Sequence, residues 1–526
     1  MKGNDPRVLR ALADPAFYPH RPPSVEVVQT HISFVFLAGE LVYKVKKPVD
    51  FGFLDFTTLE KRRLFCGEEI RLNRRLAPSV YLEVVPIREK GGRLTLGGEG
   101  ETLEYAVVMR RLPAERMLKR IIGEEGFDPS VLDAVAAKVA AFHNEAATGG
   151  AIDDMGRLTT IRRNHEENFT QTVPYIGVTI DEGAYRFICD YARRFMAEKE
   201  ELFARRVREK RIREGHGDLH LEHIIVGDEI VIFDCIEFNE RFRCGDVTAD
   251  VAFLSMDLDF NGYTGHGERF VRAYVEEAKD PGVLELIDFY RCYYAYVRGK
   301  VVSFLLDDPA VPPQEREAAR ERASRYFRLA YGYAARPARP VLILMAGLMG
   351  TGKSVLAREL APLVGGEIIR TDVLRKELHG LDERQHLYED FGAGIYGDDV
   401  SRKTYGEARR RALAILSRGR SVVIDASFKR REERRLATAE AARAGYETFV
   451  VECVCPDEVV KDRLDKRQAE AGDASDGRWE LYAAQKEDFD PVTEVEAGRH
   501  LKVDTTAPPA VCAQRILEMI KRGGGP

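Results

Sequence analysis

The sequence has few of the features that mark secreted or membrane-spanning proteins. None of its eight cysteines forms a C-x-x-C pair, and Cys453 and Cys455 share one face of an expected strand, so we expect reduced, buried thiols. No run reaches the ~18 uncharged apolar residues of a membrane-spanning helix. The first residues also lack the apolar core of a signal peptide. These absences predict a cytoplasmic protein without a membrane partner.

An excess of charge of one sign is missing as well. The 80 Lys and Arg residues nearly balance the 86 Asp and Glu residues, which leaves a net charge of −6. Such a balance gives no general attraction to nucleic acid or to anionic membranes. A local basic groove remains open. With 526 residues the chain is too long for one ordinary core, since domains usually hold ~100–200 residues.

A proline-rich segment separates two regions with different patterns. Residues 25–113 alternate like antiparallel strands around one helix, and helical periodicity then dominates up to residue 331. After Arg336-Pro-Ala-Arg-Pro340, strands and helices alternate, which implies a parallel sheet. We expect a first domain at residues 1–335, with lobes at about 1–113 and 114–335, and a second domain at residues 336–526.

The second domain contains a complete phosphate-binding loop, Gly347-Leu-Met-Gly-Thr-Gly-Lys-Ser354. It fits G-x-x-x-x-G-K-[ST], follows an apolar strand and opens a helix, as the motif requires. Backbone N–H groups of such a loop surround phosphates. Lys353 should reach the β- and γ-phosphates, and Ser354 should bind Mg²⁺. The sequence therefore predicts ATP and Mg²⁺ as cofactors. The remaining cofactor-binding positions are Gly347, Gly350, Thr351 and Gly352.

Charged residues follow the other strands of this domain. Asp425 ends an apolar strand, where an acid that binds Mg²⁺ belongs, and Asp372 lies at the end of another. We predict Asp372 as the base that accepts a hydroxyl proton and Arg375 as its anion-binding partner. Arg463 and Arg467 are four residues apart on one helix face, where they would clamp the transferred phosphate. Caps and solvated helix faces are the alternatives.

These residues resemble the small-molecule and polynucleotide kinases of the P-loop class, also called AAA-type ATP-binding domains. Gluconate kinase, chloramphenicol phosphotransferase, zeta-type toxins and the kinase half of polynucleotide kinase belong to this group. The resemblance covers roughly residues 340–521. It implies an α/β P-loop fold with a parallel sheet and a kinase rather than a ring-forming motor.

The first domain carries a second pair of acids. His216-Gly-Asp218 lies in a loop, and an apolar strand ends in Asp234-Cys-Ile-Glu237. A loop acid and an acid at a strand end are the minimal pair for phosphoryl transfer, because one accepts the substrate proton and the other holds Mg²⁺.

Here the sequence resembles the aminoglycoside phosphotransferase family over about residues 25–331. The resemblance implies an α+β protein-kinase-like fold, with Asp218 as catalytic base and Asp234 or Glu237 as the metal-binding acid. It also implies that Lys44 or Lys46 binds the phosphates of ATP, with Glu69 as ion-pair partner, and that Asp250 is a structural cap.

One position departs from the family pattern. The family has Asn five residues after the base, whereas this sequence has His223, whose imidazole is a poorer Mg²⁺ ligand. Either Asn239 or water completes the metal shell, or this half is a weak or specialised kinase. A transition-metal site of His216, Asp218, His220 and His223 is the competing interpretation.

Together these features predict a bifunctional ATP-dependent phosphotransferase that acts on hydroxyl groups of small polar molecules. Two alternatives stay open. One is a nucleic-acid 5′-end kinase, which would need a basic channel with aromatic residues; residues 403–411 and 429–435 supply charge, but aromatics are sparse there. The other is an ATPase switch whose N-terminal domain only binds a ligand. A small molecule is the favoured partner.

Overall fold

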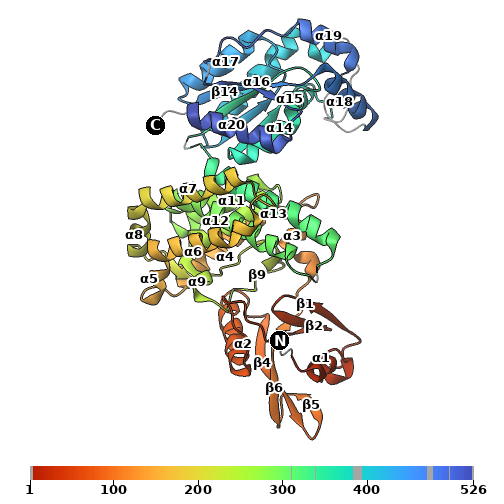
Figure 1. Ribbon diagram of the computed structural model, residues 1–526, viewed down its shortest axis with the longest axis vertical. Helices are drawn as coiled ribbons and strands as arrows, with labels where there is room; N and C mark the ends of the chain where they lie inside the picture. Colours follow the sequence, from red (N-terminus) through yellow and green to blue (C-terminus); the bar gives the residue numbers. More distant parts are fainter. Residues whose placement is uncertain are drawn as a thin grey trace. The chain divides into compact units, whose positions relative to one another are not determined.

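The computed structural model describes residues 4–309, 311–337, 339–382, 394–470, 478–496 and 498–523. The chain divides into two compact units, Met1–Ala330 and Tyr331–Pro526, which we call the N-terminal and C-terminal units (Figure 1). Within the described ranges no helix combines the length and apolarity needed to cross a membrane.

The small lobe of the N-terminal unit is an antiparallel sheet with one long helix against it. The sheet order is β1-β2-β3-β6-β4-β5, and a turn at Gly39, with φ of +65°, joins β2 to β3. Helix α2 contacts β4 and β6 and begins after Thr58, whose hydroxyl accepts the Lys61 N–H at 3.2 Å. The elements are α1 (Pro6–Leu12), η1 (Pro15–Phe17), β1 (Val25–Gln29), β2 (Ser33–Ala38), β3 (Leu41–Lys46), α2 (Leu59–Asn73), β4 (Tyr81–Lys90), β5 (Arg93–Leu96) and β6 (Glu101–Arg110).

The rest of the N-terminal unit is mainly helical, with two short antiparallel strand pairs, β7 with β10 and β8 with β9. The loop that contains Asp218 runs between β7 and β8. The elements are η2 (Ala114–Arg116), α3 (Leu118–Ile121), α4 (Ser130–Glu145), α5 (Ala151–Met155), α6 (Leu158–Thr172), η3 (Val173–Tyr175), α7 (Glu182–Glu198), α8 (Glu200–Arg208), β7 (Ile212–Glu214), η4 (Leu221–His223), β8 (Ile224–Val226), β9 (Ile230–Ile232), α9 (Glu240–Arg243), β10 (Cys244–Asp246), α10 (Thr248–Phe260), α11 (Thr264–Ala278), α12 (Val283–Ser303), η5 (Phe304–Leu306) and α13 (Pro313–Ala335), which extends into the C-terminal unit.

The C-terminal unit is built on a parallel five-stranded sheet in the order β12-β13-β11-β14-β15, flanked by helices (Figure 1). Every residue of the central strand β11 is buried, as its continuous apolar sequence predicts. The elements are β11 (Val341–Ala346), α14 (Lys353–Leu363), β12 (Gly366–Arg370), α15 (Thr371–Leu378), η6 (Gly394–Tyr396), α16 (Asp398–Leu416), β13 (Ser421–Asp425), α17 (Arg431–Arg443), β14 (Glu447–Val454), α18 (Asp457–Glu470), α19 (Trp479–Glu487), β15 (His500–Asp504) and α20 (Pro509–Gly523).

The sheets position the candidate sites through their strand ends. Because β12, β13 and β11 run parallel, their carboxyl ends meet at one edge, where Asp372, Asp425 and the phosphate-binding loop follow them. In the small lobe, Lys44 and Lys46 are two residues apart on β3 and lie on the same face of the sheet.

Candidate active sites

The loop between β11 and α14 has the backbone conformation of a phosphate cradle. Its glycines Gly347, Gly350 and Gly352 have φ of +131°, +74° and +81°. A Cβ added to Gly347 would lie 2.4 Å from the carbonyl oxygen of Cys453, so the strand neighbour requires glycine there. The Nζ of Lys353 donates to the Leu348 carbonyl at 2.6 Å. The ammonium group therefore lies against the backbone of the loop.

Asp425 lies beside this loop at the end of β13. Its carboxyl is buried and accepts a hydrogen bond from the Ser354 hydroxyl. It also interacts electrostatically with the ammonium group of Lys353. Burial raises the pKa of Asp425, although Ser354 and Lys353 act in the opposite direction. Hydroxyl and carboxylate oxygens are the ligands that Mg²⁺ prefers, so the donor set of Ser354 and Asp425 fits that ion.

Asp372 and Arg375 form a pair in the first turns of α15. The Arg375 Nη1 donates to Asp372 Oδ1 at 3.1 Å, and the Arg375 side chain is buried while that of Asp372 is about one-third exposed. Asp372 also acts electrostatically on Asp425. The structure thus brings together the predicted base, its arginine and the predicted metal-binding acid, and leaves the base open to an incoming molecule.

Arg463 supports the phosphate-binding loop through Thr505. The Arg463 Nη2 and Nη1 donate to the carbonyl and hydroxyl oxygens of Thr505 at 2.7 and 3.1 Å. The Thr505 hydroxyl in turn donates to the Thr351 carbonyl at 2.8 Å. The phosphate-clamping role of Arg463 stays a prediction. The side chain of Arg467 lies outside the described part of the chain, although its backbone belongs to α18.

In the N-terminal unit, Lys44 and Lys46 share one buried glutamate. Glu69 of α2 is fully buried and pairs through Oε1 with Lys44 Nζ at 2.9 Å and through Oε2 with Lys46 Nζ at 2.6 Å. The Lys46 side chain has no exposed surface and also pairs with Glu237. Lys44 instead pairs with Asp234 Oδ1 at 2.9 Å.

The two pairs differ in the exposure of their acids. Asp234 is partly exposed and Glu237 is buried behind Lys46. Asp234 also has φ of +63°, a conformation that non-glycine residues adopt rarely and mostly where the surrounding structure requires it. The geometry favours Lys44 as the phosphate-binding lysine and Asp234 as the metal-binding acid, while Lys46 and Glu237 form an internal ion pair.

A buried carboxylate orders the loop that carries Asp218. Asp250 of α10 accepts the N–H groups of His216 and Gly217 at 2.7 and 2.8 Å, and His143 binds it through Nε2 at 3.1 Å. Asp250 therefore caps the loop rather than the helix that contains it. The sequence indicated a structural role for Asp250, but no local pattern points to His143, which lies 107 positions away.

The histidines of this loop are hydrogen-bonded to backbone groups of neighbouring residues, and two of them lie beside the Asp218 carboxylate. His216 donates from Nε2 to the Phe233 carbonyl at 3.0 Å, and its Nδ1 accepts the Asp218 N–H at 3.3 Å. His220 Nδ1 accepts the Glu222 N–H at 3.3 Å, which directs Nε2 to Asp218 Oδ2 at 3.5 Å. Burial lowers the pKa of His216 to about 4, so this ring stays neutral.

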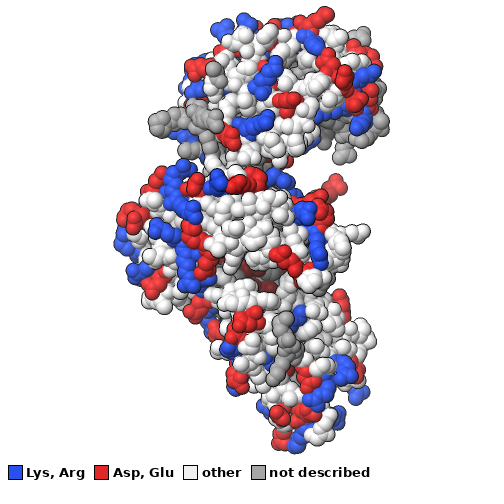
Figure 2. All heavy atoms as spheres, in the orientation of Figure 1, with Lys and Arg blue, Asp and Glu red and all other residues white. Residues whose placement is uncertain are grey.

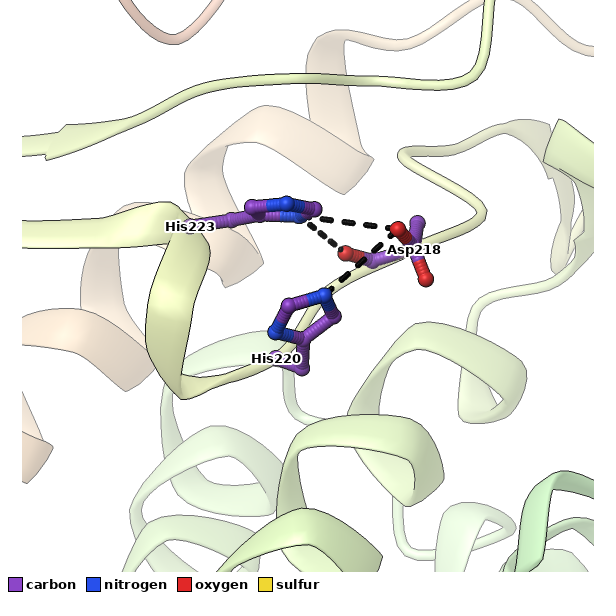
Figure 3. Close-up of side chains that lie close together, drawn as sticks. All are labelled: Asp218, His220 and His223. Atoms are coloured by element: carbon purple, nitrogen blue, oxygen red, sulfur yellow. Dashed lines mark hydrogen bonds and ion pairs between the residues drawn. The ribbon is translucent and has the colours of Figure 1, made fainter. Parts of the chain in front are cut away.

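Figure 3 shows the rings of His220 and His223 beside Asp218. These three residues offer ligand atoms within 4.8 Å of one another, so a metal site there is sterically feasible. However, both nitrogens of His216 and both of His220 already have partners, which argues against the four-residue transition-metal site. Asn239 does not supply the missing ligand either, since its amide donates to Phe53 and its oxygen accepts the Arg241 N–H.

Comparison with known proteins agrees with two kinase-type domains. Residues 60–287 match the family model described as "Phosphotransferase enzyme family", and residues 342–492 match the one described as "AAA domain". "Uncharacterized protein Rv2004c" of Mycobacterium tuberculosis is 33% identical over 465 residues, which cover 88% of this chain and 89% of the relative. The chain belongs to the family of this mycobacterial protein. "Uncharacterized protein Mb2027c" of Mycobacterium bovis matches with the same identity and coverage.

Two solved structures are each similar to part of this chain. A gluconokinase from Sinorhizobium meliloti 1021 is 23% identical with a TM-score of 0.26, over 35% of this chain and 93% of the other. A choline/ethanolamine kinase family protein from Mesorhizobium loti is 15% identical with a TM-score of 0.38, over 62% and 98%. The two family matches themselves confirm the predicted fold class: a kinase-like N-terminal region and a C-terminal P-loop fold with a parallel sheet. They support a phosphotransferase.

Proposed function

We propose that the chain is a bifunctional ATP-dependent phosphotransferase that acts on hydroxyl groups of small polar molecules, with one site in each unit. The observation that carries the proposal is the N-terminal cluster. Lys44 lies 2.9 Å from Asp234, and His223 bridges Asp234 and the loop of Asp218. A phosphate-binding cation, a metal-binding acid and a candidate base are the parts that phosphoryl transfer requires.

In the C-terminal site, Ser354 and Asp425 would hold Mg²⁺ and the loop backbone with Lys353 would hold the phosphates. Bound Mg²⁺ neutralises charge on the β- and γ-phosphates. Asp372 is the base that accepts the proton of the acceptor hydroxyl, and Arg375 holds it in position. Arg463 and Arg467 stabilise the transferred phosphoryl group.

In the N-terminal site, Asp218 is the base. Burial raises the pKa of Asp218, but interaction with His220 and His223 outweighs burial and holds this pKa well below its usual range. The carboxylate is therefore ionised and able to accept a hydrogen bond. Lys44 and Glu69 would align the phosphates, and Asp234 would hold the metal ion.

A nucleic-acid acceptor has less support because basic side chains in the two charged segments form ion pairs with acidic side chains. Arg409 pairs with Glu433, Arg411 with Glu377, and Lys429 with Asp488. On the face drawn in Figure 2, Lys and Arg are interspersed with Asp and Glu over the C-terminal unit. Such paired charges attract a phosphate backbone weakly. The eight cysteines, all of them free thiols, support our proposal of a reducing, cytoplasmic location.

An acceptor screen tests the proposal. The full-length protein should transfer the γ-phosphate of radiolabelled ATP to a sugar, polyol, nucleoside or amino alcohol, and transfer to 5′-hydroxyl oligonucleotides should be much weaker. Transfer restricted to oligonucleotides would instead establish the end-kinase alternative. ATP hydrolysis that no acceptor stimulates would favour the ATPase switch.

A further inference from the structure

Both ring nitrogens of His223 lie near a carboxylate, but among the described residues only Nε2 has no backbone partner. Its Nε2 lies 3.6 Å from Oδ2 of Asp234. Its other nitrogen, Nδ1, lies 2.9 Å from the carbonyl oxygen of Asp218. A carbonyl oxygen only accepts hydrogen bonds, so Nδ1 must carry the proton. In the neutral ring, Nε2 then presents its lone pair to Asp234.

Asp234 directs a carboxylate oxygen toward this lone pair. Its Oδ1 receives the ammonium group of Lys44 at 2.9 Å, which directs Oδ2 toward His223. The ion-pair cluster that contains Asp234 has more acidic than basic side chains. It holds the carboxylates of Glu69, Asp234 and Glu237 but only the ammonium groups of Lys44 and Lys46. A lone pair that faces a carboxylate is repelled by it, and a cation between the two atoms converts this repulsion into two bonds.

We propose that His223 Nε2 and Asp234 Oδ2 bind a first-row transition ion, with Mn²⁺, Co²⁺ and Zn²⁺ preferred over Mg²⁺. Two ligand atoms each ~2.1 Å from a metal lie ~3.0 Å apart at an octahedral angle and ~3.4 Å apart at a tetrahedral one. The observed 3.6 Å is close to these separations. Imidazole nitrogen favours transition ions, whereas Mg²⁺ favours oxygen.

The hydrogen bond from Nδ1 supports this assignment. Metal-binding histidines characteristically donate their second N–H to a carbonyl or carboxylate, which fixes the tautomer and raises the basicity of the ligand nitrogen. The Asp218 carbonyl does this for His223. The neighbouring His220 has the opposite tautomer: its Nδ1 accepts the Glu222 N–H, so in the neutral ring Nε2 carries the proton toward Asp218 and offers no lone pair. The inference rests on the proposed N-terminal kinase site and specifies its metal.

Mn²⁺ binding to the full-length protein without ATP tests the inference. Pulsed electron paramagnetic resonance detects directly bound ¹⁴N, and the predicted ligands of the C-terminal site, Ser354 and Asp425, are oxygen donors, so a nitrogen signal reports on the N-terminal site. The wild type should show this coupling. His223→Asn should lose it and bind Mn²⁺ at least ~10-fold more weakly, while the matched control His220→Asn should keep both.

Two results would overturn the inference: no nitrogen coupling in the wild type at saturating Mn²⁺, or a coupling that survives in His223→Asn. A coupling that His220→Asn removes, with the His220→Asn protein folded by circular dichroism, would also overturn it. Because the measurement needs no turnover, it separates the two proposals. Nitrogen-bound Mn²⁺ without phosphoryl transfer contradicts only the proposed function, and Mg²⁺-dependent transfer without nitrogen-bound Mn²⁺ contradicts only the metal assignment.

Discussion

In the C-terminal unit the proposed phosphate site is made of backbone: eight consecutive residues, three glycines with positive φ, and a helix that starts at Lys353. In the N-terminal unit the corresponding site is made of side chains from β3, α2, the Asp218 loop and the end of β9, which lie up to 190 positions apart. A backbone cradle tolerates changes in most neighbouring side chains, because amide groups do the binding. A side-chain cluster depends on every ion pair within it.

Among the side chains of the backbone site, we predict the largest effect for Lys353. Replacement by Ala should lower C-terminal ATP turnover by about 10³-fold, because a charge that stabilises the transferred phosphate is lost, and should leave the fold intact. Turnover with a C-terminal acceptor measures the effect. The matched control is Lys502→Ala, an exposed lysine of the same unit. Equal activities of the two variants would contradict the assignment.

Asp372→Asn should separate chemistry from binding at this site. Acceptor-dependent turnover should fall by about 10²-fold, the usual effect of losing a general base. ATP affinity, measured by calorimetry, should change little, because the loop and Asp425 hold the nucleotide. The exposed Asp457, substituted in the same way, is the control. A collapse of ATP affinity would make Asp372 a metal or nucleotide ligand instead.

The side-chain site should respond differently to its two lysines. Lys46→Met leaves Glu69 and Glu237 buried without that cation, which should cost about 3–5 kcal/mol of unfolding free energy. Lys44→Met should keep the fold, because Glu69 retains Lys46, and should abolish N-terminal turnover. Urea unfolding and activity distinguish the two. A stable but inactive Lys46→Met protein, together with an active Lys44→Met protein, would reverse the roles.

Acid should destabilise the N-terminal unit more than the C-terminal one. Burial lowers the pKa values of His165 and His216 to about 4, so between about pH 6.5 and 4 the unfolded chain binds more protons than the folded one. Stability is therefore lost as pH falls through this range, by about 2 kcal/mol per histidine at pH 5.

Trp479, the single tryptophan, reports on the C-terminal unit, and circular dichroism reports mainly on the larger N-terminal one. On going from pH 7.5 to 5, the urea midpoint seen by circular dichroism should fall more than the midpoint seen by fluorescence. His165→Asn should make the N-terminal midpoint less dependent on pH. Parallel shifts of both midpoints, with no effect of this substitution, would show that the buried histidines are not the cause.

The same contrast explains what the sequence could predict. The phosphate-binding loop, the parallel sheet and the order of the kinase-like elements are local patterns, so Lys353 and Asp425 could be named directly as candidates. The choice between Lys44 and Lys46 could not be made, because both share one strand face and only the burial of Glu237 behind Lys46 distinguishes them.

Hydrogen bonds between residues far apart in the sequence also could not be predicted from sequence patterns. Thr505 fixes the carbonyl of Thr351 from 154 positions away, and nothing near Thr505 marks it as part of a phosphate site. The tautomer of His223 likewise depends on where the carbonyl of Asp218 lies in space. Sequence spacing identifies which residue types are present, whereas hydrogen-bond partners decide which atom of each is available.

We propose that the chain has two independent phosphotransfer sites. The most direct test compares two single substitutions with the double variant. Transfer of the γ-phosphate of ATP should be measured with wild type, Lys353→Ala, Asp218→Asn and the double variant against the acceptors that the wild type uses. Each single variant should lose transfer to one set of acceptors and keep the other, and the double variant should transfer to none. Loss of all transfer in Lys353→Ala, with wild-type activity in Asp218→Asn, would contradict the claim and leave the N-terminal unit without a catalytic site.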